Sequence, residues 1–294
     1  MYSDTARAGT PTSTAPTAPT WDPQQYLRHA GHRTRPFLDL LNRIPELPTL
    51  PQTSSGGTPG ARIADLGCGP GNVTALLADR WPNARITGFD LSPEMLHRAD
   101  QEYAGPTAGG GRLDFHHADL ASWLPDEPYD LIVSNAALQW VPSHPGSFGA
   151  WINGLRPGGT FAFQIPGNYR APSHALLAEQ CDTPRWRARL AGHGARYKHF
   201  LEPAEYLARF TELGCAADVW ETTYHQLLQG PDPVLDWVKG TALRPVLTAL
   251  GDDEEAVAAF LAEYRDRLRE AYPTGPRGTV FPFRRIFAVA RKEA

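Results

Sequence analysis

A glycine-rich segment places flexible backbone beside acidic side chains, a combination that suits a small charged ligand. It reads Ile-Ala-Asp-Leu-Gly-Cys-Gly-Pro-Gly over residues 63–71. Glycines at a turn between a strand and a helix let the backbone approach a ligand closely. The dinucleotide pattern Gly-x-Gly-x-x-Gly would need a glycine where Asn72 stands. The spacing of Gly67, Gly69 and Gly71 therefore points away from a dinucleotide.

Three acidic residues accompany this loop at the ends of expected strands. Asp65 stands at the mouth of the loop, where a carboxylate would repel a pyrophosphate and attract a cation. Asp90 ends the next strand, where an acid accepts hydrogen bonds from both ribose hydroxyls. A single aspartate more often closes a turn or caps a helix. Together with Asp119 and the loop, however, the pair favours a ligand with an adenosyl ribose and a positive amine or sulfonium, such as S-adenosylmethionine.

The elements that must position these residues alternate between strand and helix. Strands are predicted at 62–66, 85–89, 113–117, 129–134 and 160–165, and helices at 72–80 and 93–101, the latter capped by Ser92. Such alternation is typical of a doubly wound parallel sheet, whose ligands bind at the carboxyl ends of the strands. Asp119 would then lie near the adenine and Asn135 beside the sulfur.

The second half of the chain is less regular. Helices are predicted at 171–191, 203–213, 231–250 (in pieces) and 252–272, with strands at 217–228 and 279–290. Asp252 is predicted to cap the last helix, with Glu255 completing a capping box. Helices between late strands suggest a cap over the ligand edge of the sheet.

Composition narrows the functional classes. Lys plus Arg is 28 and Asp plus Glu is 32, which gives a net charge of −4. Electrostatic binding of nucleic acid by the chain as a whole is therefore not expected. Three widely spaced cysteines exclude a zinc ribbon and a disulfide scaffold and suit the cytoplasm. No apolar run approaches the roughly 18 residues that a membrane-spanning helix needs. We expect a cytoplasmic monomer without metal, membrane or nucleic-acid partners, and a disordered tail at 1–20.

The motifs of the first half resemble class I S-adenosylmethionine-dependent methyltransferases. They are the loop from Asp65 to Gly71, the acids Asp90 and Asp119, and Tyr-Asp-Leu-Ile-Val-Ser-Asn at 129–135. The resemblance implies an α/β fold with a Rossmann-like seven-stranded sheet, mostly parallel with an antiparallel last strand, and S-adenosylmethionine as cosubstrate. The cofactor-binding positions that it implies are Asp65, Gly67, Gly69, Gly71, Asn72, Asp90, Leu91, Met95, Asp119, Leu120 and Asn135.

A second set of motifs, from about residue 21 to the C-terminus, resembles the trans-aconitate 2-methyltransferase family. It includes Trp-Asp-Pro at 21–23, Arg-x-Arg-Pro at 33–36, Ala-Ala-Leu-Gln-Trp at 136–140, Gln-Ile-Pro-Gly-Asn at 164–168, Thr-Thr-Tyr at 222–224, Leu-Arg-Pro at 243–245 and Arg-Ile-Phe-Ala-Val-Ala-Arg at 285–291. Members of this family methylate one carboxylate of trans-aconitate. The resemblance adds Trp21, Tyr26 and Arg33 to the cofactor site. It also implies one methyltransferase domain at 21–294, with helical cap segments at about 166–215 and 230–272.

Methyl transfer to a carboxylate needs no general base, because an ordinary carboxyl titrates near ~4 and is ionised at pH 7. The protein must instead hold the remaining carboxylates and aim the reacting one. The planar fork of arginine suits this task. The substrate-binding candidates are Arg35, Arg244, Arg285, Tyr224, Gln139 and Trp140, while Tyr264, Gln164 and Asn168 could add hydrogen bonds or walls.

Two choices among the arginines stay open. One of Arg33 and Arg35 could hold the methionine carboxylate of the cofactor instead of the substrate. Arg284 and Arg285 are neighbours in a strand, so only one can face a ligand on a given face, and we favour Arg285. The basic stretch at 185–198 is expected to be a solvated face of the cap, or else a funnel for a polyanion.

Other functions remain as alternatives. An O-methyltransferase for another small carboxylic acid would share the same motifs. A phenol methyltransferase would need a base and an apolar pocket rather than several arginines. A nicotinamide oxidoreductase is disfavoured by Asp65 and Asn72. A regulatory protein that binds the cofactor without turnover would keep the same cofactor motifs.

Overall fold

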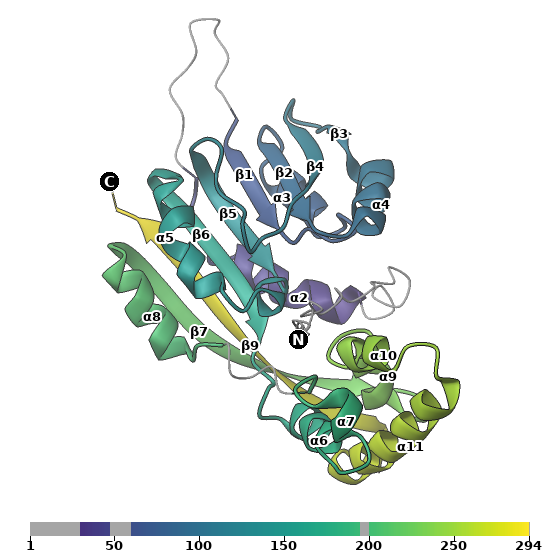
Figure 1. Cartoon of the computed structure of the whole chain (residues 1–294). Coiled ribbons are helices and arrows are strands. Elements are labelled where there is room, and N and C mark those ends of the chain that lie inside the picture. Colours follow the sequence, from purple (N-terminus) through teal and green to yellow (C-terminus); the bar gives the residue numbers. More distant parts are fainter. Residues whose placement is uncertain (1–29, 48–59, 195–199, 294) are drawn as a thin grey trace, which may run out of the picture.

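The computed structural model describes residues 30–47, 60–194 and 200–293, and they are built around one twisted sheet (Figure 1). The strand order is β3-β4-β2-β1-β5-β6-β9-β7, and β8 pairs with β9. The strands are β1 Arg62–Leu66, β2 Arg85–Asp90, β3 Gly105–Pro106, β4 Arg112–His117, β5 Tyr129–Asn135, β6 Leu155–Pro166, β7 Cys215–Leu228, β8 Thr274–Gly275 and β9 Gly278–Lys292.

The sheet confirms the predicted fold class. Strands β4, β2, β1, β5 and β6 pair in parallel, and β9 runs antiparallel to both β6 and β7. All residues of β5 are buried, as expected for a continuous apolar strand in a doubly wound sheet. The two-residue strands β3 and β8, which the sequence did not predict, extend the edge next to β4 and the hairpin that leads into β9.

Helices cover both faces of the sheet. They are α2 Ala30–Leu41, α3 Thr74–Arg80, α4 Pro93–Tyr103, α5 His144–Asn153, α6 Pro172–Cys181, α7 Arg187–Leu190, α8 Pro203–Glu212, α9 Pro233–Lys239, α10 Arg244–Leu250 and α11 Glu254–Ala271, with a short 3-10 helix η1 at Leu138–Trp140. Residues of α2, α3 and α4 share one buried cluster with the sheet, and residues of α5 and α8 share another. We call these two faces the α2 face and the α8 face.

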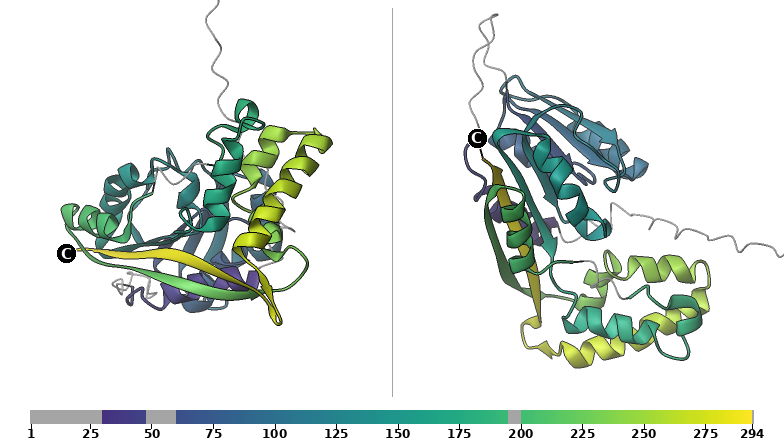
Figure 2. Two further views of the ribbon diagram at one scale, coloured as in Figure 1. Left: turned by 90° about the horizontal axis from the view of Figure 1, so that it is seen from below. Right: turned by 60° about the vertical axis from the view of Figure 1, so that its left-hand side comes forward.

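The helices α6, α7, α9, α10 and α11 form a separate group, which we call the cap. Figures 1 and 2 show the cap beyond the end of the sheet toward which β1, β5 and β6 run. Its own buried cluster includes Trp186, Trp237 and Phe260, and the far ends of β7 and β9 enter it through Leu228 and Phe281. Helix α8 lies within the expected cap segment at 166–215, yet it packs on β7 with the cluster of the α8 face.

Two local predictions were wrong. The helix expected at 171–191 is broken into α6 and α7, with Pro184 in the gap between them. The side chain that caps α11 belongs to Asp253, which accepts a hydrogen bond from the backbone of Ala256, rather than to Asp252. By contrast, Ser92 caps α4 as predicted.

Two arginines of the basic stretch are paired with acids of α11 and its N-cap. Arg185 binds Glu263, and Arg189 binds Asp253 at 2.7 Å. Arg187 donates to the backbone carbonyl of Asp182 at 2.9 Å, and the cations at 196 and 198 lie outside the described residues. This pairing fits a solvated face better than a funnel that attracts polyanions. Of the helices in the described part of the chain, none combines the length and apolar character of a membrane span.

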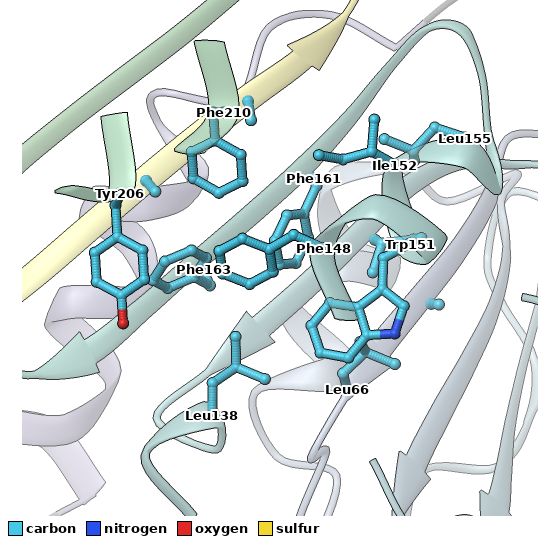
Figure 3. Packing of buried hydrophobic residues seen from close by; sticks show 14 of the residues in the cluster. Leu66, Leu138, Phe148, Trp151, Ile152, Leu155, Phe161, Phe163, Tyr206 and Phe210 are labelled. Atoms are coloured by element: carbon cyan, nitrogen blue, oxygen red, sulfur yellow. The ribbon is translucent and has the colours of Figure 1, made fainter. Parts of the chain in front are cut away.

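Aromatic side chains dominate the core of the α8 face (Figure 3). Phe148 stacks on Phe210 with ring centroids 5.0 Å apart, and Phe163 meets Tyr206 edge to face at 5.1 Å. His144 is fully buried among these rings. Its Nδ1 lies 2.8 Å from the carbonyl oxygen of Val141, and its Nε2 lies 2.8 Å from the hydroxyl of Tyr206. The neutral imidazole therefore links the segment before α5 to α8.

Acid should destabilise the protein through His144. Burial lowers the pKa of this imidazole from 6.5 to about 4. Between these two pH values the unfolded chain therefore binds a proton that the folded protein does not bind. Stability should be unaffected above pH 6.5 and fall as the pH drops from 6.5 to 4, by about 3 kcal/mol in all. Urea unfolding of the wild type and His144→Gln across this range would measure the difference. Equal pH dependence in the two proteins would contradict the assignment.

Candidate functional site

The glycine loop between β1 and α3 is held tightly on one side and open on the other. Gly67, Gly69 and Gly71 have φ angles of +80°, +55° and +81°, which glycine adopts without strain. A Cβ on Gly67 would lie 2.1 Å from that of Ala137, and one on Gly71 would lie 2.9 Å from the ring of Phe115. A Cβ on Gly69 would meet nothing within 4 Å. The open side of the loop at Gly69 is where a ligand can approach the backbone.

Asp90 joins this loop to the start of α4. One carboxylate oxygen accepts from the backbone N–H of Gly69 at 2.9 Å, and the other accepts from Ser92 at 2.9 Å. Burial raises the pKa of Asp90, while these backbone hydrogen bonds oppose the rise. Each carboxylate oxygen can accept more than one hydrogen bond, so Asp90 keeps capacity for hydroxyl donors such as those of a ribose.

Asp65, expected at the mouth of the loop, is fully buried near the end of β1. One oxygen accepts from the hydroxyl of Thr74 at 2.7 Å, and the other is buried without a hydrogen-bond partner among the described residues. Burial raises the pKa of Asp65 to about 7; the bond from Thr74 opposes the rise and the charge of Asp90 adds to it. An unsatisfied buried acceptor is costly, and a cationic donor would satisfy it. This oxygen and the open side of Gly69 fit a ligand with an ammonium group.

The other expected cofactor positions are placed as follows. Asp119 is exposed and closes a turn by accepting from the backbone of Ala121 at 2.9 Å, so its contact with an adenine stays a prediction. Leu91 is exposed, whereas Met95, Leu120 and Asn135 are buried, and Asn72 has a buried Oδ1 without a partner among the described residues. Trp21 and Tyr26 lie outside the described residues, as does the side chain of Arg33 in α2.

A row of polar side chains crosses the α2 face near the carboxyl ends of the parallel strands. Alternation along each strand puts its members on this face, since four of them have a neighbour two residues away in the α2-face cluster and the fifth, Tyr224, belongs to that cluster itself. Gln164 Nε2 donates to Asn135 Oδ1 at 2.5 Å, and Arg285 Nη1 donates to Gln164 Oε1 at 3.0 Å. We call this set the polar row: Asp65 of β1, Asn135 of β5, Gln164 of β6, Arg285 of β9 and Tyr224 of β7.

The two neighbouring arginines of β9 face opposite ways. Arg285 is 4% exposed and stands on the α2 face with its guanidinium 4.8 Å from the ring centroid of Phe283. Arg284 turns to the α8 face, where it binds Glu202 at 2.6 Å and Glu221 at 3.0 Å. Arg285 is thus the member of the pair that joins the polar row, while its contact with a substrate stays a prediction.

Tyr224 connects the polar row to helix α2. Its hydroxyl donates to Asp39 at 2.6 Å, and the guanidinium of Arg35 lies 5.1 Å from its ring centroid. The Arg35 side chain is 73% exposed and lies 4.0 Å from Asp39, so it is far less enclosed than Arg285. Burial raises the pKa of Tyr224, and Asp39 adds to the rise, so the phenol stays protonated at neutral pH.

The segment after β5 brings Gln139 and Trp140 to the same edge. Ala136 adopts φ of +55°, and its N–H donates to the carbonyl oxygen of Gln164 at 2.9 Å. Gln139 donates back to the carbonyl of Ala136, and its own Oε1 is buried without a partner among the described residues. The close approach of Ala137 to Gly67 joins this segment to the glycine loop.

Two of the expected site residues, Arg244 and Tyr264, lie in the cap. Arg244 begins α10 and is half-buried, and its Nε is buried without a hydrogen-bond partner among the described residues. Tyr264, which could have lined the site, lies inside the cap core and donates to the carbonyl of Ser173 instead. Asn168 accepts from the backbone of Arg284 at 2.6 Å.

Sequence reasoning missed Thr74 and Asp39, the partners of Asp65 and Tyr224. Both pairs join a helix to a strand, and the Asp39–Tyr224 pair spans most of the chain. No local pattern marks such contacts. The one signal in the sequence is that each is a short polar residue within a helix whose neighbouring positions are apolar.

Comparison with known proteins agrees with this geometry. Residues 63–159 match a family model described as a methyltransferase domain. Two curated relatives named trans-aconitate 2-methyltransferase, from Streptomyces avermitilis and Streptomyces coelicolor, are each 64% identical over 94% of the chain, covering 98% and 88% of their own lengths.

A solved structure shares the fold. The S-adenosylmethionine-dependent methyltransferase from Geobacter sulfurreducens, determined in complex with S-adenosylhomocysteine, superposes with a TM-score of 0.50. It is 20% identical and covers 92% of this chain and 99% of its own. At that identity the likeness concerns the architecture of the sheet and its helices.

Proposed function

The chain belongs to the trans-aconitate 2-methyltransferase family, whose members depend on S-adenosylmethionine, and we propose that its polar row positions the acceptor for this reaction. The product would be the monomethyl ester of trans-aconitate, formed by direct in-line transfer to a substrate carboxylate. S-adenosylmethionine supplies the methyl group from its sulfonium. The observation that carries the proposal is Arg285, a cation almost fully withdrawn from water beside the carboxyl edge of the sheet.

The residues around the glycine loop would hold the cofactor. Asp90 would accept from the ribose hydroxyls, and the oxygen of Asp65 that no described residue pairs would accept from the ammonium group. Gly69 would let the backbone approach the ligand. Asn72, whose Oδ1 also lacks a partner among the described residues, adds another acceptor just before α3. This side of the site therefore offers acceptors to a cationic ligand.

The other side of the site would hold the acceptor's carboxylates. Arg285 offers a desolvated guanidinium, and its fork matches a carboxylate in bidentate fashion. Arg244 would offer its Nε, which has no partner in the described part of the chain, and Arg35, Tyr224, Gln139 and Trp140 would complete the surroundings. Because the reacting carboxylate is ionised at pH 7, these residues need only bind and aim it.

A methyl-transfer assay tests the proposal. The protein is incubated with S-adenosylmethionine and trans-aconitate, cis-aconitate, isocitrate or a long-chain acid, and the products are weighed by mass spectrometry. We expect one added methyl group on trans-aconitate and much less on the others. Transfer to a different small carboxylic acid, with none to trans-aconitate, would overturn the proposal in favour of the related carboxylate methyltransferase.

Cofactor affinity should rise with pH through the titration of Asp65. Its pKa of about 7 leaves the carboxyl protonated below that pH, where it cannot pair with an ammonium group. The affinity for S-adenosylhomocysteine should therefore increase up to about tenfold per pH unit between pH 5 and pH 7 and then level off. Calorimetric titration of the wild type and Asp65→Asn would show it. The proposal fails on this point if wild-type affinity is constant over that range.

We further propose a cytoplasmic monomer that acts without nucleic acid. Cys68, Cys181 and Cys215 are all buried free thiols, which suits a reducing compartment. We also propose that residues 21–294 form a single domain, with cap segments at about 166–215, apart from α8, and at 230–272. The antiparallel pair of β7 and β9 supports this, because it contributes side chains both to the sheet cores and to the cap core. Light scattering on the purified chain tests the monomer.

A further inference from the structure

Gln164 occupies the centre of the polar row. It is fully buried on β6, and it is the residue that touches both Arg285 and Asn135. The chain of hydrogen bonds runs from the arginine of β9, through the amide of β6, to the amide at the end of β5. It therefore spans the distance between the expected substrate side and the expected cofactor side of the site.

Arg285 fixes the donor-to-acceptor direction of these two hydrogen bonds. A guanidinium has donors and no acceptor, so Gln164 must turn its oxygen toward Arg285. Its nitrogen then faces Asn135, which must offer its oxygen in return. As a consequence, any group that binds the NH₂ of the Asn135 amide has to accept a hydrogen bond from it. One cation thus sets the orientation of two neutral amides.

We propose that Gln164 is a positioning residue, which holds Arg285 and Asn135 in one fixed arrangement for methyl transfer. The inference rests on the proposed function, since it assigns Arg285 to a carboxylate of the acceptor. A bidentate clamp works only if the plane of the guanidinium is fixed. Gln164 Oε1 accepts from Nη1 of Arg285 at 3.0 Å and so fixes one edge of that plane.

The backbone and the side chain of Gln164 have separable tasks. Its carbonyl oxygen accepts from Ala136 and so supports the segment with Gln139 and Trp140. Its neighbours Phe163 and Ile165 pack into the α8-face core. Every substitution keeps the backbone contact and these neighbours. Side-chain variants at position 164 therefore probe the hydrogen-bond chain without removing the strand.

Two variants and a matched control test the proposal. Gln164→Leu removes both hydrogen bonds, whereas Gln164→Glu keeps an acceptor for Arg285 and cannot donate to Asn135. The control is Gln180→Leu, because Gln180 is also a buried glutamine but donates to Phe260 within the cap. We expect Gln164→Leu to raise the KM for trans-aconitate and lower kcat, each about tenfold. The affinity for S-adenosylhomocysteine should change less than threefold.

Gln164→Glu should raise the KM more than Gln164→Leu does, because its carboxylate competes for the guanidinium that the acceptor needs. Gln180→Leu should lower the melting temperature as much as Gln164→Leu and leave the kinetic constants unchanged. If Gln164→Leu behaves like Gln180→Leu in the assay, the residue is merely part of the core and the proposal is wrong.

A spectroscopic readout keeps the test independent of the acceptor. The side-chain amide signals of Gln164 and Asn135 are followed by NMR in isotope-labelled protein saturated with S-adenosylhomocysteine. Arg285→Leu should shift both signals, and Arg244→Leu should shift neither. If the Asn135 signal does not shift in Arg285→Leu, the proposed hydrogen-bond chain is wrong, even if the enzyme is active. If both signals shift but the protein does not methylate trans-aconitate, the hydrogen-bond chain is supported and the proposed substrate is wrong.

Discussion

Replacing Arg285 with leucine should reduce kcat/KM for trans-aconitate by about 10²- to 10³-fold, because a buried charged partner of the acceptor is worth roughly 3 to 4 kcal/mol. Arg285 is 4% exposed, so water screens the attraction of its guanidinium for a carboxylate only weakly. Calorimetry should find the affinity for S-adenosylhomocysteine within threefold of the wild type, since the acids around the glycine loop are untouched. Steady-state kinetics with varied trans-aconitate measures the loss.

The neighbouring residue supplies the matched control for this prediction. Arg284→Leu removes the same charge one residue away, but on the α8 face, where Glu202 and Glu221 occupy the guanidinium. Its kcat/KM should stay within threefold of the wild type. Arg285→Lys keeps the charge without the planar fork and should recover only part of the activity. Equal losses in Arg284→Leu and Arg285→Leu would mean that overall charge, rather than the polar row, governs the acceptor.

Much of the fold could be predicted because its signals are local. The apolar run at 129–134 predicted a strand buried on both faces, and β5 is buried throughout. The glycine loop and Asp90 could be predicted for the same reason, since a strand–turn–helix fixes their place. The error at Asp252 concerns a helix boundary, where adjacent residues compete for one capping position and packing decides. The helix expected at 171–191 breaks around Pro184, which does not fit a helix interior.

The rest of the site depends on contacts between distant segments. Alternation along β9 predicted that one of Arg284 and Arg285 would face the site, but the acids that hold Arg284 on the other face come from α8 and β7. Thr74 beneath Asp65 and Asp39 beside Tyr224 carry no signature in the sequence. The burial of Asp65 also depends on packing, because the same motif would suit an exposed carboxylate. The sequence could therefore predict which residues matter at the cofactor edge more readily than how they are partnered.

Asp90→Asn should weaken the binding of S-adenosylhomocysteine by about 10²- to 10³-fold, because hydrogen bonds to a charged group contribute roughly 1.5 to 3 kcal/mol each. In the folded protein both carboxylate oxygens already accept backbone N–H groups, one from Gly69 and one from Ser92. An asparagine presents one oxygen and one NH₂ group, so one of these two N–H groups would face a donor. The glycine loop or the start of α4 must then shift, and a ribose would lose its charged acceptor as well.

Ser92→Ala is the control that distinguishes a loss of cofactor affinity from a loss of stability. It removes the side chain that caps α4 while leaving the carboxylate of Asp90 and its contact with Gly69 in place. It should reduce the free energy of unfolding by about 1 kcal/mol, the usual worth of an N-cap, and change cofactor affinity less than threefold. Asp90→Asn should lose affinity far beyond any such loss of stability. If the two variants bind S-adenosylhomocysteine equally well, Asp90 serves only to fasten the loop to α4, and the ribose must be held elsewhere.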